Sequence, residues 1–536
     1  MLETLILTFL VTLTTWFIIQ RKRRLSFFKD LGIMGPPPSF LTGNLCELVE
    51  KGSLLSFKQW LDKYGDIVGF YNGAHPFLIV KDKELAKKIQ IKDFHNFHSR
   101  GMSSSFARSH PVNKHSLTNS EADRWKQMRS LISLAFTTRN MKKMVNLMDD
   151  STDDFLSVVE DMRSKQKAIE FRQLFQRLAA EVMIRSAFGL KSNLQNKGLR
   201  NSTAESLFQE SLEAFQQFRH AWINFLTACF PEFSILWRAI ISYFSRHNKT
   251  AADKTFDEIT PIIQFRRENP EKNRTDLLQL MLNAEVEDEM PVSVHSLTAS
   301  YDVDSASEEK HTVEMVNVNA KKRCLTNVEI LANGFTLFMA GFETTGTSLA
   351  FMAYLLAKHQ DVQDRLREEI LAVLNRDGEF MYDNVFGMKY MDQVISETLR
   401  CFSPVTGFTT RRCACDYVHN GITIPAGTSI VIASHYMSND PAYWNKPENF
   451  DPERFSPENK CQVDPTVYQP FGQGPRNCVG MRFAQLEMKL VMAKLLAQYK
   501  LILDDRHIKE KHLGIGSTFA MAYPKNGVWL KVEKIS

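Results

Sequence analysis

A single cysteine within FGQGPRNCVG, residues 471–480, is the feature that most restricts what this chain can fold into and do. Three glycines in this stretch permit positive φ angles and close backbone approach, so the loop can wrap around the Cys478 sulfur and leave room for a flat ligand. Arg476 adds a fixed cation that suits carboxylates. A helix-forming run, MRFAQLEMKLVMAKLLAQY, follows directly and places the cysteine near a helix N-terminus, which favours the thiolate. The glycines are Gly472, Gly474 and Gly480.

A thiolate in such a loop serves either as a nucleophile or as a metal ligand. A nucleophile normally needs an adjacent base, and this stretch contains no histidine, although a distant one can fold close. The 8 cysteines of the chain are sparse and irregular, without a CxxC pair, so neither a disulfide framework nor a zinc site is indicated. The residues alone therefore leave both uses of the thiolate open, and the sparse cysteines indicate a reducing compartment.

The N-terminus differs in composition from the rest of the chain. Its apolar run, MLETLILTFLVTLTTWFII, carries Glu3 as its only charge and is followed by RKRR. At a rise of about 1.5 Å per residue, this run nearly crosses the roughly 30 Å hydrocarbon core of a bilayer. A cleaved signal peptide would need a basic residue before the run and a small-residue cleavage site after it, and neither is present. The positive-inside rule then places the rest of the chain on the cytosolic side.

The chain is therefore expected to have three parts and a mainly α body with a little β structure. Helical periodicity dominates residues 120–400. The parts are a transmembrane anchor at 1–20, a basic and Pro-rich linker at 21–38, and a globular body at 39–536; short strands are predicted at 67–80, 428–436 and 527–532.

Two stretches of the body stand out by composition. Residues 285–322 are polar and rich in Ser, Glu and Lys, which predicts a mobile surface loop, with a domain linker as the alternative. Residues 230–244 are dense in aromatic side chains, which allows either a core helix or a surface segment that dips into the membrane. A net charge of +5 without a basic stripe interleaved with aromatics argues against nucleic-acid binding.

The cysteine stretch matches the pattern F-x-x-G-x-R-x-C-x-G of the cytochrome P450 family. With average residue usage, a match at these five positions arises by chance on the order of once in ten thousand chains of this length. The chain therefore resembles this family, in which the cysteine is the axial thiolate ligand of haem iron. The resemblance implies one mainly α (α+β) domain that binds haem b between a long central helix and the cysteine loop. The matching residues are Phe471, Gly474, Arg476, Cys478 and Gly480, and Gly472 lies within the same haem-binding loop.

A long helix predicted over residues 326–358 carries the next similarity. TNVE forms a capping box at its start, and AGFETTG lies further along it. Alone, Glu343 and Thr344 in mid-helix indicate a solvent-facing pair or a back-bonded threonine. The resemblance instead makes them the catalytic residues, which pass protons to dioxygen at the haem, and it implies that Ala340 and Gly341 leave room over the iron.

The segments ETLR and PERF supply a third similarity. Glu397 and Arg400 are three residues apart on a predicted helix, which by itself indicates a surface pair worth a few tenths of a kcal/mol. In the family, the corresponding Glu and Arg join a buried network with the arginine of the later segment, here Arg454. The resemblance therefore implies a structural network that supports the haem loop.

Further residues are implied to hold the haem propionates. WKQMR places Trp125 and Arg129 four residues apart on one helix face, as in the W-x-x-x-R helix of the family. Arg411, five residues before Asp416, matches another propionate-binding arginine, but the neighbouring Arg412 is an alternative.

These similarities occur in the family's order across nearly the whole chain, and they are most like the drug- and steroid-oxidising family 3-like group of microsomal enzymes. That resemblance implies a monooxygenase that inserts one oxygen atom of O2 into a lipophilic xenobiotic, steroid or fatty-acid-like molecule. Electrons would come from NADPH through a flavin-containing cytochrome P450 reductase, with cytochrome b5 as an optional second partner. The implied location is the endoplasmic reticulum membrane, with a single span in membrane lipid and the catalytic domain in the cytosol.

Two alternatives stay open at this point, a haem-thiolate isomerase or dehydratase and a non-catalytic haem-binding protein. The Glu343–Thr344 pair argues against the first, because a pre-formed peroxide needs no proton delivery to dioxygen. Substrate recognition is expected from 103–115, from 205–244 and from Phe338 and Phe342. The candidates for a basic reductase-docking face are Arg139, Lys142, Lys143, Arg482 and Lys489.

Overall fold

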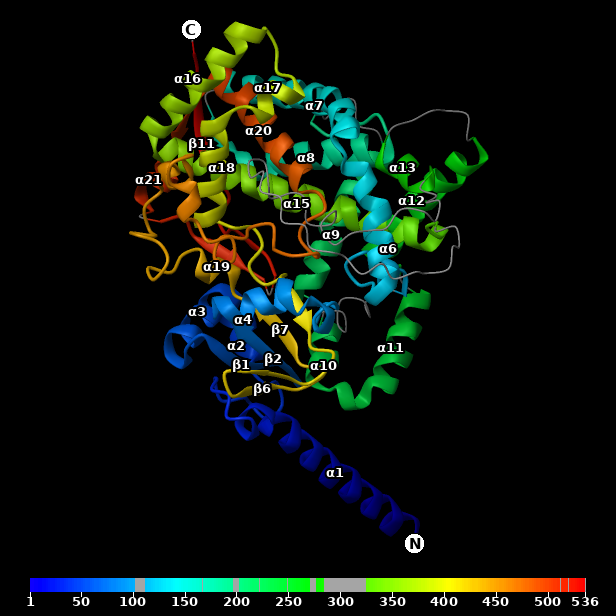
Figure 1. Ribbon diagram of the computed structural model, residues 1–536. Coiled ribbons are helices and arrows are strands. Elements are labelled where there is room, and N and C mark those ends of the chain that lie inside the picture. The colour runs from blue at the N-terminus through cyan, green and yellow to red at the C-terminus, as the bar shows by residue number, and fades with distance from the viewer. Residues whose placement is uncertain are drawn as a thin grey trace, which may run out of the picture.

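Helices make up most of the body, and the largest sheet lies at the end from which the N-terminal helix projects (Figure 1). This arrangement confirms the predicted mainly α class with a small β-rich region. The polar stretch 285–322 and residues 103–110 of the expected substrate-recognition stretch lie outside the described residues. The computed structural model describes residues 1–101, 111–165, 167–195, 202–220, 222–247, 249–269, 276–283, 324–510, 512–518 and 520–535.

The long central helix α15 (Asn327–Lys358) confirms the helix predicted over 326–358. It begins with the predicted capping box: the Glu329 N–H donates to Thr326 Oγ1 over 3.3 Å, and the Thr326 N–H donates to Glu329 Oε2 over 2.8 Å. These bonds satisfy backbone donors that a helix start leaves free. A bidentate ion pair between Arg124 and Glu329 ties this start to α6 (Ala122–Ser133).

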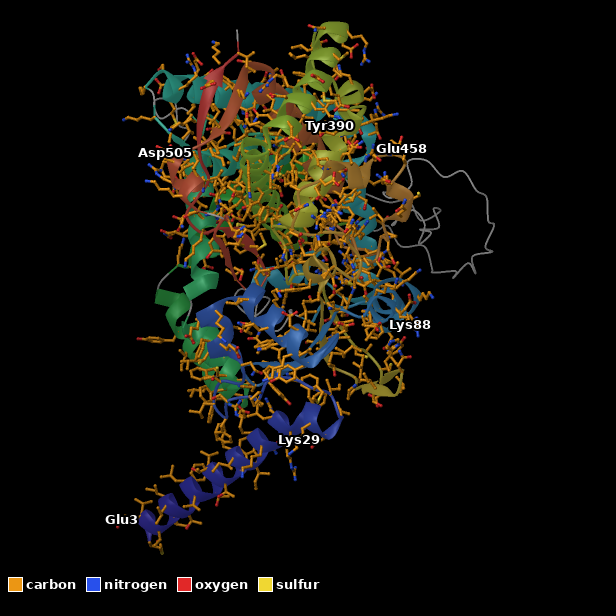
Figure 2. The ribbon with its side chains drawn as sticks, turned by 90° about the vertical axis from the view of Figure 1, so that its left-hand side faces the viewer. Glu3, Lys29, Lys88, Tyr390, Glu458 and Asp505 are labelled. Atoms are coloured by element: carbon orange, nitrogen blue, oxygen red, sulfur yellow. The ribbon has the colours of Figure 1, made fainter. Side chains whose placement is uncertain are left out.

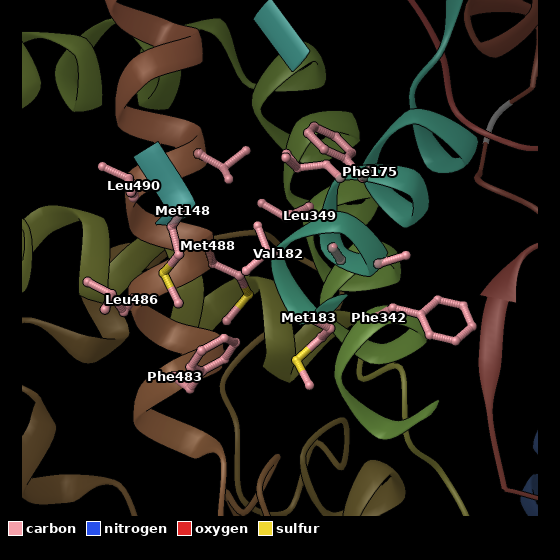
Figure 3. Packing of buried hydrophobic residues seen from close by; sticks show 14 of the residues in the cluster. Met148, Phe175, Val182, Met183, Phe342, Leu349, Phe483, Leu486, Met488 and Leu490 are labelled. Carbon is pink, nitrogen blue, oxygen red and sulfur yellow. The ribbon is translucent and has the colours of Figure 1, made fainter. Parts of the chain in front are cut away.

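Helix α15 packs closely against α8 (Phe171–Phe188), and two glycines make this approach possible. A Cβ atom on Gly341 would lie 2.5 Å from Met183 Sδ, and one on Gly346 would lie 2.9 Å from Gln176 Cα. Figure 3 shows Met183 of α8 and Phe342 of α15 among the buried hydrophobic side chains of this core. The glycines therefore set the spacing of the two helices at the centre of the body.

Phe338 and Phe342, expected to face substrate, are fully buried in this core. The Phe338 ring lies 6.0 Å from Phe188 on α8, and the Phe342 ring lies 6.0 Å from Phe208 on α9 (Ser202–His220). Both rings thus pack between helices in the described structure.

The largest sheet has four strands in the order β1-β2-β7-β4. The predicted hairpin over 67–80 is confirmed as β1 (Ile67–Asn72) and β2 (His75–Val80), joined by a turn in which Gly73 adopts φ +66°. Strand β7 (Ser429–Ile432) pairs with β2 in parallel and with β4 (Thr410–Arg412) in antiparallel register. The strand predicted over 428–436 is thus shorter than expected, because the chain turns into the short helix α19 (Ser434–Met437).

The N-terminal helix α1 spans Leu2–Asp30 and projects from the body, with Glu3 and Lys29 marking its two ends in Figure 2. It is long and apolar enough to cross a membrane. The helix also continues through the basic cluster, well into the predicted linker 21–38, since Lys and Arg are good helix formers. The chain leaves the helical conformation only before the GPPP stretch.

The aromatic stretch 230–244 does not form a core helix. It folds as the short η5 (Pro231–Phe233) followed by α11 (Ser234–His247), and Ile235, Leu236 and Tyr243 are exposed. Helix α11 lies at the same end of the body as α1 (Figure 1).

The C-terminal strand predicted over 527–532 is confirmed as β11 (Trp529–Lys534), which pairs with β3 (Ile169–Glu170) and β8 (Tyr499–Leu503). The remaining strands are β5 (Tyr417–His419), β6 (Ile422–Ile424), β9 (Ile515–Ser517) and β10 (Ala522–Pro524). The remaining helices are α2 (Leu45–Lys51), α3 (Ser53–Tyr64), α4 (Lys83–Lys87), η1 (Lys88–Lys92), η2 (Phe94–Asn96), η3 (Pro111–His115), η4 (Leu134–Phe136), α7 (Thr138–Ser164), α10 (Trp222–Cys229), α12 (Ala251–Glu268), α13 (Leu277–Asn283), α16 (Gln360–Asp377), α17 (Tyr382–Phe386), α18 (Lys389–Cys401), η6 (Pro452–Phe455), η7 (Lys460–Gln462), α20 (Met481–Gln498) and α21 (Asp505–Lys509).

Candidate active site

The loop that carries Cys478 is held by short backbone hydrogen bonds and by two glycines in the left-handed region. The Cys478 N–H donates to the Phe471 carbonyl over 2.8 Å, which closes the loop. Gly472 and Gly474 have φ angles of +73° and +71°, as expected, whereas Gly480 has φ −93° and needs no special freedom. A Cβ atom on Gly474 would lie 2.0 Å from a backbone carbonyl oxygen of η1, so this glycine also permits a close approach.

The Cys478 thiol lies directly before the N-terminus of α20, as predicted, and its side chain is exposed. Protein atoms nevertheless surround it closely enough that burial raises the pKa of the Cys478 thiol, while Arg129, the Gly480 N–H and Arg100 oppose that rise. The Gly480 N–H at the helix N-terminus therefore favours the thiolate, as expected, but burial outweighs it and the net pKa of Cys478 is raised. A ligand that bonds the sulfur, such as a metal ion, would supply the missing stabilisation.

Four arginines from separate parts of the chain form one cluster, and two of them, Arg129 and Arg100, lie close enough to oppose the burial-driven rise in the pKa of this thiol. Arg129 on α6 donates from Nη1 to the Asn477 carbonyl over 2.9 Å and from Nη2 to Asn477 Oδ1 over 2.7 Å, so it grips the loop next to the cysteine. Arg476 donates from Nη2 to the Ser120 carbonyl over 2.6 Å. The four are Arg100, Arg129, Arg411 and Arg476.

Trp125 supports this cluster through its ring. The Arg476 guanidinium carbon lies 4.5 Å from the centroid of the buried Trp125 ring, a cation–π contact. The predicted pair of Trp125 and Arg129 therefore presents both side chains towards the cysteine loop from one face of α6.

The arginine cluster holds buried positive charge that the described part of the chain does not neutralise. The Nε atom of each of the four is buried without a hydrogen-bond partner, and none of the four forms an ion pair with a described residue. Burial lowers the pKa of Arg100 and Arg129 to about 10 and that of Arg411 to about 9, and it also lowers the pKa of Arg476. Unpaired buried cations are costly, so the cluster fits a ligand with two carboxylates, such as haem with its propionates.

Arg100 is a member of the cluster that the sequence motifs do not reveal. It follows Ser99, whose carbonyl accepts the Arg412 N–H over 2.8 Å in an isolated β-bridge beside β4. Its own Nη1 donates to the Phe408 carbonyl over 2.6 Å. The local sequence has no distinctive pattern, so only the bridge to a segment some three hundred residues away brings this cation to the site.

The structure separates the two candidate arginines on β4. Arg411 is buried, and the charge of Arg100 is second only to burial in lowering its pKa. Arg412 is partly exposed and pairs with Glu121 over 2.7 Å. Because adjacent strand residues point to opposite faces, only Arg411 joins the cluster.

Glu343 and Thr344 on α15 have different surroundings. The Glu343 carboxylate is buried, with an ion pair of 3.2 Å to Arg172 Nη2 and a hydrogen bond of 2.6 Å from Gln176 Nε2, both on α8. Thr344 is half-buried and donates from Oγ1 to the Ala340 carbonyl over 2.7 Å. The two side chains are therefore not hydrogen-bonded to each other here.

Ala340 and Gly341, both expected to leave room over the iron, have different surroundings. Ala340 is exposed in the middle of α15 and stays the candidate for the surface over the iron. The missing side chain of Gly341 makes room for Met183 of α8, so its packing role is evident and a role over the iron stays a prediction.

Glu397, Arg400 and Arg454 form a buried network, as the resemblance implied. Arg400 Nε and Nη2 donate to the two Glu397 carboxylate oxygens over 2.7 and 2.9 Å, and both side chains are fully buried. Arg454 Nε reaches Glu397 Oε1 over 3.3 Å. The remaining Arg400 donors bind the carbonyls of Ser438, Pro447 and Asn449, so the network ties α18 to the chain that leads into the cysteine loop.

Lys489 is wrong as a candidate for a docking surface. Its side chain is buried, and Nζ lies 2.7 Å from Asp392 Oδ1 and 3.1 Å from the Phe386 carbonyl. Burial lowers the pKa of the Lys489 ammonium, while Asp392 opposes that shift. Of the other candidates, Arg139, Lys142 and Lys143 are exposed and Arg482 is partly buried.

Comparison with known proteins identifies the family of the chain. The family model described as Cytochrome P450 matches residues 34–526. Cytochrome P450 3A13 of Mus musculus is 31% identical over 516 residues, which cover 94% of this chain and 92% of that protein. Cytochrome P450 3A5 of Homo sapiens is 31% identical over 519 residues, with the same coverages of 94% and 92%. Lithocholate 6-beta-hydroxylase of Mesocricetus auratus is 31% identical over 512 residues, which again cover 94% and 92%. The chain therefore belongs to the cytochrome P450 family, whose members bind haem b and act as monooxygenases.

Proposed function

We propose that the chain is a membrane-anchored, microsomal monooxygenase that inserts one oxygen atom of O2 into a lipophilic small molecule. The observation that carries the proposal is the Cys478 thiol beside a cluster of four buried arginines that lack counter-ions in the described part of the chain. Cys478 would hold the haem iron through its sulfur, and the arginines would bind the two propionates. Haem b, when bound there, supplies the iron at which dioxygen is activated.

Proton movement would fall to α15. Thr344 Oγ1 now donates its proton to the Ala340 carbonyl, and Glu343 is held by Arg172 and Gln176. A group that delivers a proton has to come within hydrogen-bond reach of its acceptor. Glu343 would therefore have to exchange its partners on α8 before it relays a proton towards Thr344, and we assign the two residues as the catalytic pair on this basis.

The membrane assignment draws on α1 and on the apolar side chains near it. The helix is long and apolar enough to span a bilayer, and Ile235, Leu236 and Tyr243 on α11 are exposed at the same end of the body. We place the chain in the endoplasmic reticulum membrane with its catalytic domain in the cytosol. Electrons would come from NADPH through the flavoprotein reductase, with cytochrome b5 as an optional partner.

The substrate is proposed by class alone. The relative from Mesocricetus auratus is named for 6-beta-hydroxylation of lithocholate, and the chain resembles the drug- and steroid-oxidising group as a whole. We therefore propose a lipophilic xenobiotic, steroid or fatty-acid-like molecule as the substrate.

The first test is the carbon monoxide difference spectrum of the reduced, full-length protein. A thiolate-ligated haem gives a red-shifted band, which Cys478→Ser should abolish together with NADPH-dependent turnover. Near-normal turnover in that variant would refute the ligand assignment. Reconstitution with the reductase then separates the activities, because an isomerase or dehydratase would rearrange peroxides without NADPH, and a non-catalytic haem protein would do neither.

A further inference from the structure

Helix α10 ends in a turn whose backbone carbonyls are bound by three different parts of the chain. The Ala74 N–H of the β1–β2 hairpin donates to the Ala228 carbonyl over 2.9 Å, and Trp237 Nε1 donates to the Phe230 carbonyl over 2.7 Å. The carbonyl of Cys229, the last residue of α10, accepts a hydrogen bond from Arg21 Nη2 of α1. Because the last carbonyls of a helix lack partners within it, Arg21 acts as a cap that comes from a helix distant in sequence.

Arg21 is fully buried, which is unusual for an arginine that directly follows an apolar run. Its guanidinium carbon lies 5.2 Å from the Phe17 ring centroid and 5.4 Å from the Phe230 ring centroid, both within cation–π range. The Phe17 ring also stacks on the Phe233 ring at a centroid distance of 6.0 Å. One aromatic ring from α1 and one from the turn thus flank this side chain.

Glu232 of η5 provides the counter-charge. Its buried carboxylate lies 3.5 Å from Arg21 Nη2 and 3.6 Å from Arg24 Nη1, one helical turn further along α1. Glu232 therefore links α1 to the segment that connects α10 with α11. Removal of one member of a buried ion pair leaves the other charge uncompensated, which is strongly destabilising.

The β1–β2 hairpin contacts the opposite side of this turn at the end of α10, which restricts how far the turn can move. Gly73 lies so close that a Cβ atom there would be 2.3 Å from the Ala228 carbonyl carbon. The segment from Ala228 to Phe233 is therefore held between the β1–β2 hairpin and α1.

We infer that Glu232 and the end of α10 form a docking site for the anchor helix, which binds there through Arg21. Helix α1 and the α10–α11 segment then behave as one rigid unit. The catalytic domain then keeps a set orientation relative to its anchor instead of swinging on a flexible tether. The inference rests on the proposed role of α1 as the membrane anchor, and it adds the residues that join anchor and body.

Cys229 is a native reporter for this contact. It is fully buried, and burial raises the pKa of its thiol to about 11, so in the docked state it should react slowly with maleimide. Five other cysteines are exposed, and one of them, Cys478, is set aside because it would bind the haem in the loaded protein. The remaining four serve as internal standards within each sample: Cys46, Cys324, Cys415 and Cys461.

The experiment measures the maleimide labelling rate of Cys229 by peptide mass spectrometry, using the full-length, haem-loaded protein in phosphatidylcholine vesicles. Glu232→Gln should raise that rate, relative to Cys46, at least about tenfold, since loss of the ion pair favours opening. Arg21→Lys should raise it as well, because lysine keeps the charge that orients α1 but lacks the planar fork that reaches both Cys229 and Glu232. Asp383→Asn, which removes an exposed ion pair with Lys142, is the matched control and should leave the rate unchanged.

Two results would overturn the inference: Cys229 labelling as fast as Cys46 in the unmodified protein, or rates in Glu232→Gln and Arg21→Lys equal to that of the control. If Glu232→Gln fails to fold, Arg21→Lys still gives the decisive rate. Vesicle flotation and the carbon monoxide spectrum are recorded on the same samples. If the unmodified protein does not float with the vesicles, the proposed anchor is contradicted, and if it lacks the red-shifted band, the proposed haem site is contradicted. The docking site is tested by the labelling rates alone.

Discussion

Replacement of Glu397 with glutamine would remove the negative charge from a network in which every other charged member is a cation. The Glu397 carboxylate accepts two hydrogen bonds from Arg400, lies 3.3 Å from Arg454 and accepts the Asp451 N–H over 2.9 Å. Both Glu397 and Arg400 are fully buried, so water cannot solvate the Arg400 cation that would be left without its partner. Breaking a buried pair of this kind typically costs about 3 to 5 kcal/mol, a large share of the roughly 5 to 15 kcal/mol that stabilises a typical domain.

A matched control is available one residue from Arg454. Glu453 pairs with Arg365 at the surface, where the two side chains are 46% and 55% exposed, and such pairs contribute at most about 1 kcal/mol. Equilibrium urea unfolding, followed by haem absorbance and far-ultraviolet circular dichroism, should therefore show a loss of about 3 kcal/mol or more for Glu397→Gln and less than about 1 kcal/mol for Glu453→Gln. Equal losses in the two variants, or a loss below about 1 kcal/mol for Glu397→Gln, would refute the argument that this network supports the cysteine loop.

Three further variants test other parts of the site. Arg100→Gln removes one of the charge-assisted contacts expected to hold the propionates, so haem transfer to apomyoglobin should accelerate about tenfold or more, and an unchanged rate would remove Arg100 from the site. Arg172→Gln releases the Glu343 carboxylate from its ion pair, so kcat should change at least about threefold, whereas the spin-state shift on substrate binding should stay the same. A changed spin-state shift with constant kcat would contradict the proton-delivery role. Gly474→Ala and Gly472→Ala both strain a positive φ by about 1 kcal/mol or more, but only the former also meets a backbone carbonyl 2.0 Å away, so its melting temperature should fall several degrees further. Equal melting temperatures would show that this contact relaxes freely.

Several features of the molecule could be predicted because they depend on residues close together in the chain. The capping box of Thr326 and Glu329 begins α15 as predicted, and the Asn72–Gly73 turn joins β1 to β2. The spacing of Glu397 and Arg400 places both on one face of α18, where they pair. Hydrogen bonds within a turn or a helix need only a few neighbouring residues, so a short pattern determines them.

Other features depend on which elements meet, and the sequence left these open or pointed elsewhere. The partners of Glu343 come from α8, and the position of Arg100 depends on a bridge to the strand that carries Arg412. Lys489 is buried by the packing of α17 and α18 against α20, although its charge suggests a surface position. Burial and long-range pairing arise from the whole packing arrangement, for which no local pattern exists.

The sequence by itself determined the chemistry of the chain: a lone cysteine in a glycine-rich loop, a basic residue beside it, and an apolar N-terminal run. Only the tertiary structure decided how charge is distributed around that cysteine and how the anchor helix joins the body through Arg21 and Glu232. The physical reason is that the identity of a ligand atom is a property of one side chain, whereas an uncompensated buried charge or a docked helix exists only where distant segments come together and exclude water.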